Sequence, residues 1–229
     1  MSSQSWGAPV ATQTPAVRTQ FMTRVYVHLV AAVAAFVVLE WWLFSSGLAR
    51  SFTQFVAGTS WLLILGGFML VSWLASSVAT RMDSRPAQYG AFAALVGAEA
   101  LIFTPLLYIA AVDGPDGVIS RAGMISVVAF IGLSGVAITS SADFSFLRVL
   151  LRWGAVVALL LIVGAVVFGA SLGTWFSVAM IAFAGAAILY DTQKILRHYP
   201  ADREVAAAMS LFASLALLFW YVLRLLSRR

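Results

Sequence analysis

The longest apolar stretch of the chain is WGAVVALLLIVGAVVFGASLGTWFSVAMIAFAGAAILY, residues 153–190, which contains no charged side chain. As one helix it would measure about 57 Å, nearly twice the ~30 Å hydrocarbon core of a bilayer. The segment FGASLGT, 168–174, interrupts the stretch with two glycines and small polar residues. We therefore predict two membrane-spanning helices here, joined by a tight turn near 169–174.

Composition extends this interpretation to the whole chain. Of its 229 residues, 62% are hydrophobic and only 10% are charged, whereas soluble domains carry about 25% charged residues. The expected fold is all-α: a polytopic membrane protein with seven transmembrane helices in one domain, 21–229, surrounded by the lipid bilayer. The five further apolar runs cover 25–49, 52–80, 86–112, 122–142 and 205–223. The start of the run 52–80, FTQFVAGTS, is interpreted as a loop.

The basic residues predict the orientation of these helices. Nine Lys and Arg residues fall on the side of the N-terminus and five on the other, which predicts a cytoplasmic N-terminus. The C-terminal LRLLSRR, 223–229, opposes this assignment, because seven full spans would put its three arginines outside the cell. The last segment therefore either ends outside against the rule or does not cross the membrane completely. Residues 1–20 are rich in Ser, Thr, Gln and Pro and are predicted to form a disordered tail. The pattern fits a bacterial inner membrane, with an organelle membrane as the alternative.

Several functional classes are disfavoured. The chain has no cysteine, which excludes disulfides and thiolate chemistry, and its dispersed basic residues argue against nucleic-acid binding. The turn 169–173 fits the G-x-S-x-G pattern of hydrolases, but the only histidines, His28 and His198, are predicted on the opposite side of the membrane. We expect neither an enzyme nor a cofactor.

Four ionisable residues interrupt or end the apolar runs: His28, Glu40, Glu99 and Asp191. A carboxylate in mid-membrane costs about 2.5–3.5 kcal/mol on insertion scales, so each should be paired or functional. Glu40 is expected to reach the interface, and His28 to be a hydrogen-bonded structural group.

Glu99 and Asp191 carry the functional hypotheses. Glu99 lies in the middle of the third span, and Thr104-Pro105 follow one turn later, which predicts a kink. It either belongs to an ion or proton path or bonds a neighbouring helix. Asp191 is expected at the cytoplasmic end of the sixth span, where Lys194 or a neighbouring arginine could neutralise it.

The end of the chain resembles the Bax inhibitor-1 family. ILYDTQKILR, 188–197, precedes a last helix that ends LFWYVLRLL, 218–226, and SSADFSFL, 140–147, falls in the family's order. So do Arg24-Val25-Tyr26 and Glu99 with its following Thr-Pro. The resemblance implies six helices around a central last one, and links to calcium leak and pH sensing. It also implies a sensor made of two aspartates that share a proton.

This chain departs from that family pattern at the second aspartate. Asp191 occupies the first sensor position, but Ser214 stands at the second, and Leu217 replaces the family's asparagine. A lone carboxylate loses the repulsion on which such a pair depends. Calcium usually takes six to eight oxygens, so one carboxylate and a hydroxyl would hold it weakly.

Two main hypotheses follow. The first is a calcium or cation leak channel of altered pH sensitivity, with Asp191 as gate and calcium ligand, Glu99 as pore group, Ser214 as hydrogen-bond partner and Arg81 or Arg85 as latch. The second is a non-conducting regulator that binds other membrane proteins, such as a quality-control protease. A proton-coupled transporter is a third reading, but the chain lacks the internal repeat common in such folds.

Overall fold

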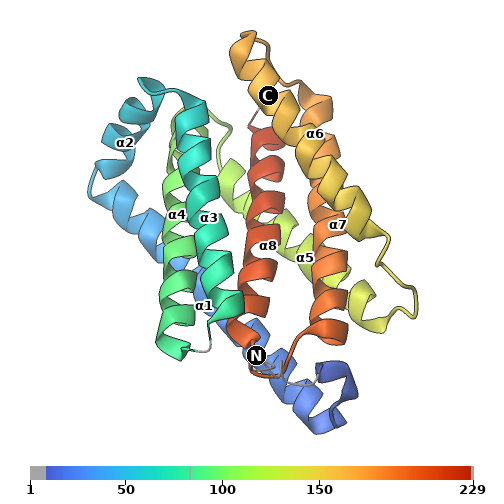
Figure 1. Ribbon diagram of the computed structural model, residues 1–229. Coiled ribbons are helices and arrows are strands. Elements are labelled where there is room, and N and C mark those ends of the chain that lie inside the picture. The colour runs from blue at the N-terminus through green and yellow to red at the C-terminus, as the bar shows by residue number, and fades with distance from the viewer. Residues whose placement is uncertain (1–8, 83, 228–229) are drawn as a thin grey trace, which may run out of the picture.

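Seven long helices and one short one run through residues 9–82 and 84–227, the part of the chain that the computed structural model describes (Figure 1). A single 3₁₀ turn, η1, precedes them. The elements are η1 (Val10–Thr12), α1 (Pro15–Ser45), α2 (Leu48–Ala57), α3 (Trp61–Arg81), α4 (Arg85–Val112), α5 (Val118–Thr139), α6 (Leu147–Val167), α7 (Thr174–His198) and α8 (Glu204–Leu226).

All of these α-helices except α2 are long and apolar enough to cross a membrane, which confirms the predicted seven spans. The uncharged run 153–190 is divided as expected, because α6 ends at Val167 and α7 begins at Thr174. Gly169 between them has a φ of 65°, a left-handed conformation that glycine adopts without steric cost.

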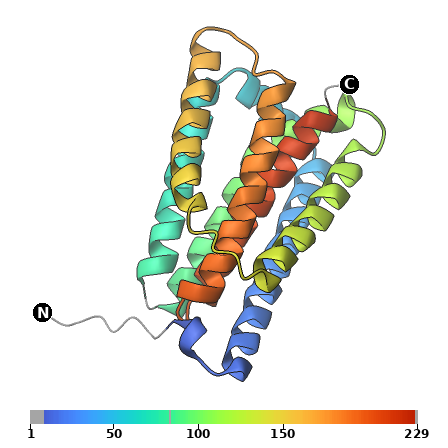
Figure 2. The same ribbon diagram turned by 90° about the vertical axis from the view of Figure 1, so that its right-hand side faces the viewer.

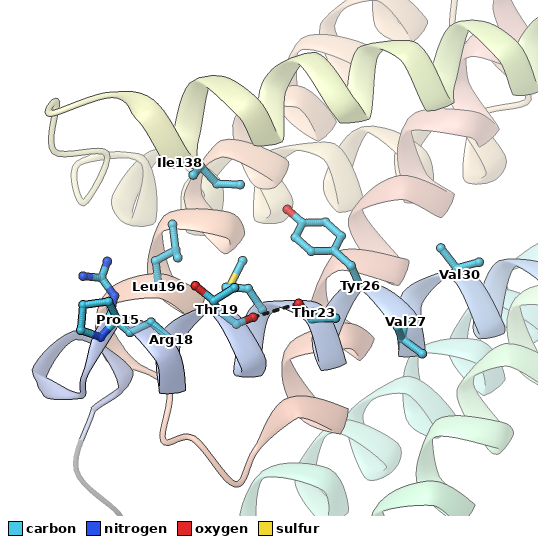
Figure 3. A pocket seen from close by; sticks show the side chains of 10 residues that line it. Pro15, Arg18, Thr19, Thr23, Tyr26, Val27, Val30, Ile138 and Leu196 are labelled. Atoms are coloured by element: carbon cyan, nitrogen blue, oxygen red, sulfur yellow. Dashed lines mark hydrogen bonds between the residues drawn. The ribbon is translucent and has the colours of Figure 1, made fainter.

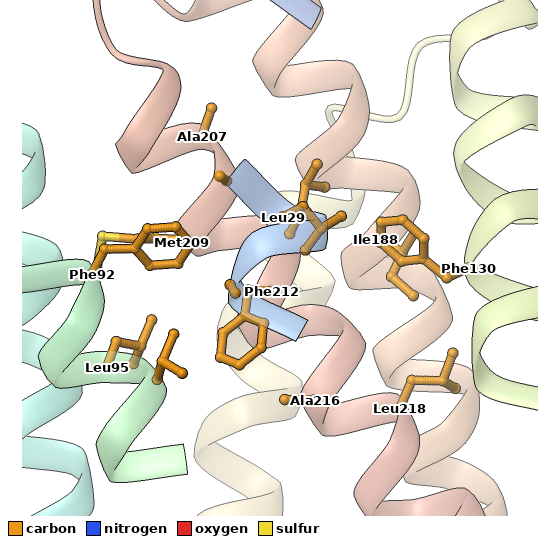
Figure 4. Packing of buried hydrophobic residues seen from close by; sticks show 14 of the residues in the cluster. Leu29, Phe92, Leu95, Phe130, Ile188, Ala207, Met209, Phe212, Ala216 and Leu218 are labelled. Carbon is orange, nitrogen blue, oxygen red and sulfur yellow. The ribbon is translucent and has the colours of Figure 1, made fainter. Parts of the chain in front are cut away.

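The last helix, α8, is the centre of the bundle. It contacts α1, α3, α4, α5 and α7, and Figure 1 shows it between the other helices. Met209 and Phe212 of α8 pack among side chains of the surrounding helices, including Leu29, Phe92 and Ile188 (Figure 4). In contrast, α6 packs mainly on α7 and lies at the edge.

Two boundaries differ from the sequence predictions. The predicted loop at 52–60 is wrong over its first six residues, because α2 extends to Ala57 and packs on α4 and α1. Its apolar side chains Leu48, Phe52, Phe55 and Val56 recur at helical spacing.

The other boundary is at the N-terminus. Helix α1 starts at Pro15, inside the segment expected to be disordered, where a proline at the first helical position has a suitable φ. Val10 is fully buried, and its N–H donates to the Tyr199 carbonyl at 2.9 Å, so this segment lies on the α7–α8 loop. Residues 1–8 of the expected tail lie outside the described residues.

Successive spans run in alternate directions, so the described ends of the chain lie at opposite ends of the bundle (Figure 2). The α3–α4, α5–α6 and α7–α8 loops lie at the N-terminal end. With 23 residues, α8 measures about 35 Å and is long enough to cross completely. This favours the alternative in which the last segment crosses the membrane completely and ends on the side opposite the N-terminus.

Candidate functional site

A groove of about 1280 Å³ passes between α3, α4, α6, α7 and α8. It reaches from the α6–α7 turn at Gly169 to Thr80 and Ala206 near the opposite end of the bundle. Most of its lining is apolar, but both carboxylates singled out in the sequence, Glu99 and Asp191, face it. The groove exists because α6 packs mainly against α7 and makes only a small contact with α3.

Asp191 and Ser214 are in direct contact. The Ser214 hydroxyl donates a hydrogen bond to Asp191 Oδ2 at 2.6 Å, which joins the middle of α8 to α7. Helix α7 continues to His198, so the prediction that Asp191 ends the helix is wrong: it lies about two turns inside. Lys194 of the next turn lies over the rings of Tyr190 and Tyr199, with its Nζ 5.9 and 5.6 Å from their centroids.

Glu99 approaches the groove from the middle of α4. Its side chain is buried, and no hydrogen-bond partner for its carboxyl lies among the described residues. The predicted alternative of a bond to a neighbouring helix is therefore not met. The helix continues through Pro105 to Val112. A buried carboxyl that faces a cavity without a protein partner is available to an ion, a proton or water.

The other two ionisable residues of the spans have structural partners. Glu40 does not reach the interface as expected: it is buried 3.3 Å from the Thr104 hydroxyl and does not line the groove. His28 is hydrogen-bonded as predicted, with its Nε2 2.9 Å from the Tyr89 hydroxyl and its Nδ1 2.7 Å from a backbone carbonyl of α1.

The predicted counter-ions of Asp191 lie elsewhere. Arg85, the first residue of α4, forms an ion pair with Glu204, the first residue of α8. Arg81 is exposed at the last position of α3. Neither guanidinium pairs with Asp191 in the described part of the chain, because both lie at the bundle's end whereas Asp191 lies deeper. Glu204, which is buried, is a residue that sequence reasoning missed; its signal is an acidic side chain directly before an uncharged run.

The rest of the YDTQ element fastens the loop between α5 and α6. Gln193 accepts a hydrogen bond from the Phe144 N–H and donates one to the Ala142 carbonyl, both at 2.7 Å. One turn on, Arg197 lies 3.5 Å from Asp143. The Ser145 backbone N–H, then the Ser145 hydroxyl and Arg197, hold the pKa of Asp143 below its usual range. The YDTQ element thus contributes Asp191 to the groove and, through Gln193, holds the loop between α5 and α6.

The described lining of the groove offers oxygen atoms but no cluster of metal-ligating side chains. Its oxygens come from two carboxylates and from hydroxyls such as those of Ser72, Ser76 and Ser214. Among the described residues, no three His, Cys, Asp or Glu side chains gather as a metal site would need. Asp191 alone supplies too few oxygens to hold calcium, which usually takes six to eight.

Two comparisons with known proteins place the chain among membrane proteins. The sequence model of a family described as "Inhibitor of apoptosis-promoting Bax1" matches residues 18–229. A Vibrio cholerae serotype O1 protein named "Uncharacterized membrane protein" is 32% identical over 124 residues. That match covers 52% of this chain and 53% of the relative, so the chain spans about half the length of the curated relative it matches.

Proposed function

The chain belongs to the Bax inhibitor-1 family of membrane proteins, and from this premise we propose that it is a cation leak channel that passes calcium along the groove beside α8. The single observation that carries the proposal is that Glu99 and Asp191 line one continuous groove, which runs through most of the bundle's length. Both sides of such a path would need polar groups, because moving a cation from water into apolar surroundings costs at least several kcal/mol even after water and protein groups adjust around it.

Asp191 and Ser214 are the proposed gate. Their 2.6 Å hydrogen bond leaves no room for an ion between the two side chains. Passage between α7 and α8 at this level therefore requires the bond to open, after which the carboxylate is available to a cation. Glu99 supplies a second carboxyl group along the path.

We also propose that the N-terminus faces the cytoplasm of a bacterial cell whose inner membrane holds the protein. Nine of the fourteen Lys and Arg residues lie at the N-terminal end of the bundle, as positive-inside sorting requires. Calcium would enter from the end that bears the α6–α7 turn and leave beside Thr80 and Ala206.

Calcium flux into liposomes that carry the purified protein, at pH 6, 7 and 8, tests the proposal. We expect Asp191→Asn and Glu99→Gln each to change the flux by about tenfold, the effect of ~1.4 kcal/mol on an ion's passage. The matched control is Glu40→Gln, which alters a buried carboxyl outside the groove and should leave flux unchanged. Unchanged flux in the double variant Asp191→Asn with Glu99→Gln would contradict the proposal.

A second function, a non-conducting regulator of another membrane protein, is favoured by one observation. The Asp191–Ser214 bond closes the place where the family pattern puts a second aspartate. Residues 1–8 would then serve as a segment for a partner protease to engage. Deletion of residues 1–8, which spares the buried Val10, separates the two functions. If the protein is such a regulator, the deletion should abolish regulation. If it is a channel, the deletion should leave calcium flux intact.

A further inference from the structure

A second groove, of about 750 Å³, lies at the N-terminal end of the bundle, away from the two carboxylates. One face of the first half of α1 forms its floor, and the ends of α5 and α7 contribute Ile138 and Leu196 (Figure 3). The α1 side chains that line it recur every three or four residues, as one helix face requires.

The polar and apolar groups of this groove are segregated along α1. Arg18 and Thr19 lie at the end nearest the N-terminus, and Val27 and Val30 lie at the other end (Figure 3). Val30 is 67% exposed and Ile138 is 48% exposed, as expected of side chains that face lipid. A charged head followed by an apolar trough matches the layout of a phospholipid molecule.

Arg18 is exposed and is not paired with any acidic side chain of the described residues. The sequence contains no Asp or Glu before Glu40, so its charge is not balanced locally along the chain. Nine Lys and Arg residues lie at this end of the bundle. A phosphate group is a ligand that a guanidinium binds with two parallel hydrogen bonds.

Tyr26 adds a buried polar atom between these two ends. Its hydroxyl faces Ser134 of α5 but makes no hydrogen bond of ordinary length in the described part of the chain. Tyr26 follows Arg18 by eight residues, about 12 Å along the helix axis. That distance places the hydroxyl below the headgroup layer, at the level where the hydrocarbon begins.

We propose that this groove binds one anionic phospholipid from the leaflet that surrounds the N-terminal end of α1. Its phosphate contacts Arg18, and one acyl chain lies along Met22, Val27 and Val30, past the Tyr26 ring, whose hydroxyl stays turned toward Ser134. The inference is independent of the proposed cation leak, because none of these residues lines the larger groove.

Native mass spectrometry of the full-length protein tests the proposal. The protein, purified in detergent, is incubated with an equimolar mixture of phosphatidylglycerol and phosphatidylcholine of identical acyl chains. We expect one phosphatidylglycerol retained per chain in preference to phosphatidylcholine. Arg18→Ala should lower that preference about fivefold, the contribution of one basic residue at an anionic surface.

Two further variants separate the headgroup from the groove. Val30→Trp, which fills the apolar trough, should reduce retention of both lipids, with an unchanged melting temperature as the check of folding. Arg50→Ala, which removes an exposed arginine of α2 at the opposite end of the bundle, should keep the wild-type preference. Equal retention of the two lipids by the wild type, or an unchanged preference in Arg18→Ala, would overturn the proposal.

Discussion

The Ser214 hydroxyl stands where the family pattern has a second aspartate, and it bonds Asp191 at 2.6 Å. Replacement by aspartate would bring two carboxylates into contact, and two such groups cannot both ionise cheaply. The pair would titrate as a unit, so the flux of the variant should depend on pH more steeply than that of the wild type. We expect the calcium flux of Ser214→Asp to change more than about threefold between pH 6 and 8, beyond any change in the wild type.

The matched control for this variant is Ser214→Asn, because the asparagine side chain has nearly the same size as that of aspartate but carries no charge. If its flux follows pH as steeply as that of Ser214→Asp, the response does not come from a carboxylate pair. A flat profile in both variants would show that position 214 does not control passage.

At the level of single residues, sequence reasoning succeeded where a motif fixes the pairing and failed where packing decides it. Asp191 and Ser214 could be paired because the resemblance to the family assigns its two sensor positions to these residues. The ion pair of Arg85 with Glu204 joins residues 119 positions apart, and only the arrangement of α4 and α8 brings them together. Hydropathy placed Glu40 near the end of a span but could not tell that its side chain faces Thr104.

At the level of helices, α6 packs against α7 at Gly154, where the Phe183 ring leaves no room for a side chain. A Cβ at Gly154 would lie 2.8 Å from Cε2 of the Phe183 ring, closer than such atoms approach. In Gly154→Ala the ring must therefore turn, and overpacking of this kind costs about 1–3 kcal/mol. The higher helix propensity of alanine offsets up to about 1 kcal/mol of that cost. We expect Gly154→Ala to lower the free energy of unfolding by ~1 kcal/mol, seen as a lower melting temperature in detergent.

Gly164→Ala is the control for this prediction, since nothing lies within 4 Å of a Cβ built at that position of the same helix. It should melt at or above the wild-type temperature. Phe183 lines the large groove, so Gly154→Ala should also change calcium flux. Equal melting temperatures for the two variants would show that the Gly154–Phe183 contact relaxes without cost.

The helices themselves were largely predictable, because a span needs a fixed length of apolar residues and hydropathy reports that length directly. What hydropathy could not report was α2, whose ten residues are too few to span and whose amphipathic pattern was hidden at the edge of a longer apolar run. The extension of α7 past Asp191 was also missed, since charged residues mark where an apolar run ends but not where a helix does.

At the scale of the whole molecule, seven spans require the two described ends of the chain to lie on opposite sides of the membrane. The natural chain has no cysteine, so each introduced cysteine is the single thiol of its variant. Thr12 and Ser141 are exposed at the N-terminal end of the bundle, and Asp116 and Ser171 are exposed at the other end. From the positive-inside rule we predict that the first pair lies in the cytoplasm.

A membrane-impermeant maleimide applied to intact spheroplasts should label Asp116→Cys and Ser171→Cys, and should label Thr12→Cys and Ser141→Cys only after lysis. The reverse pattern would place the N-terminus outside, and the direction of the proposed calcium path would reverse with it. Labelling of Ser141→Cys and Ser171→Cys from the same side would mean that α6 does not cross. The groove between α3 and α6 would then not span the bilayer, and Glu99 and Asp191 could not belong to one path through it.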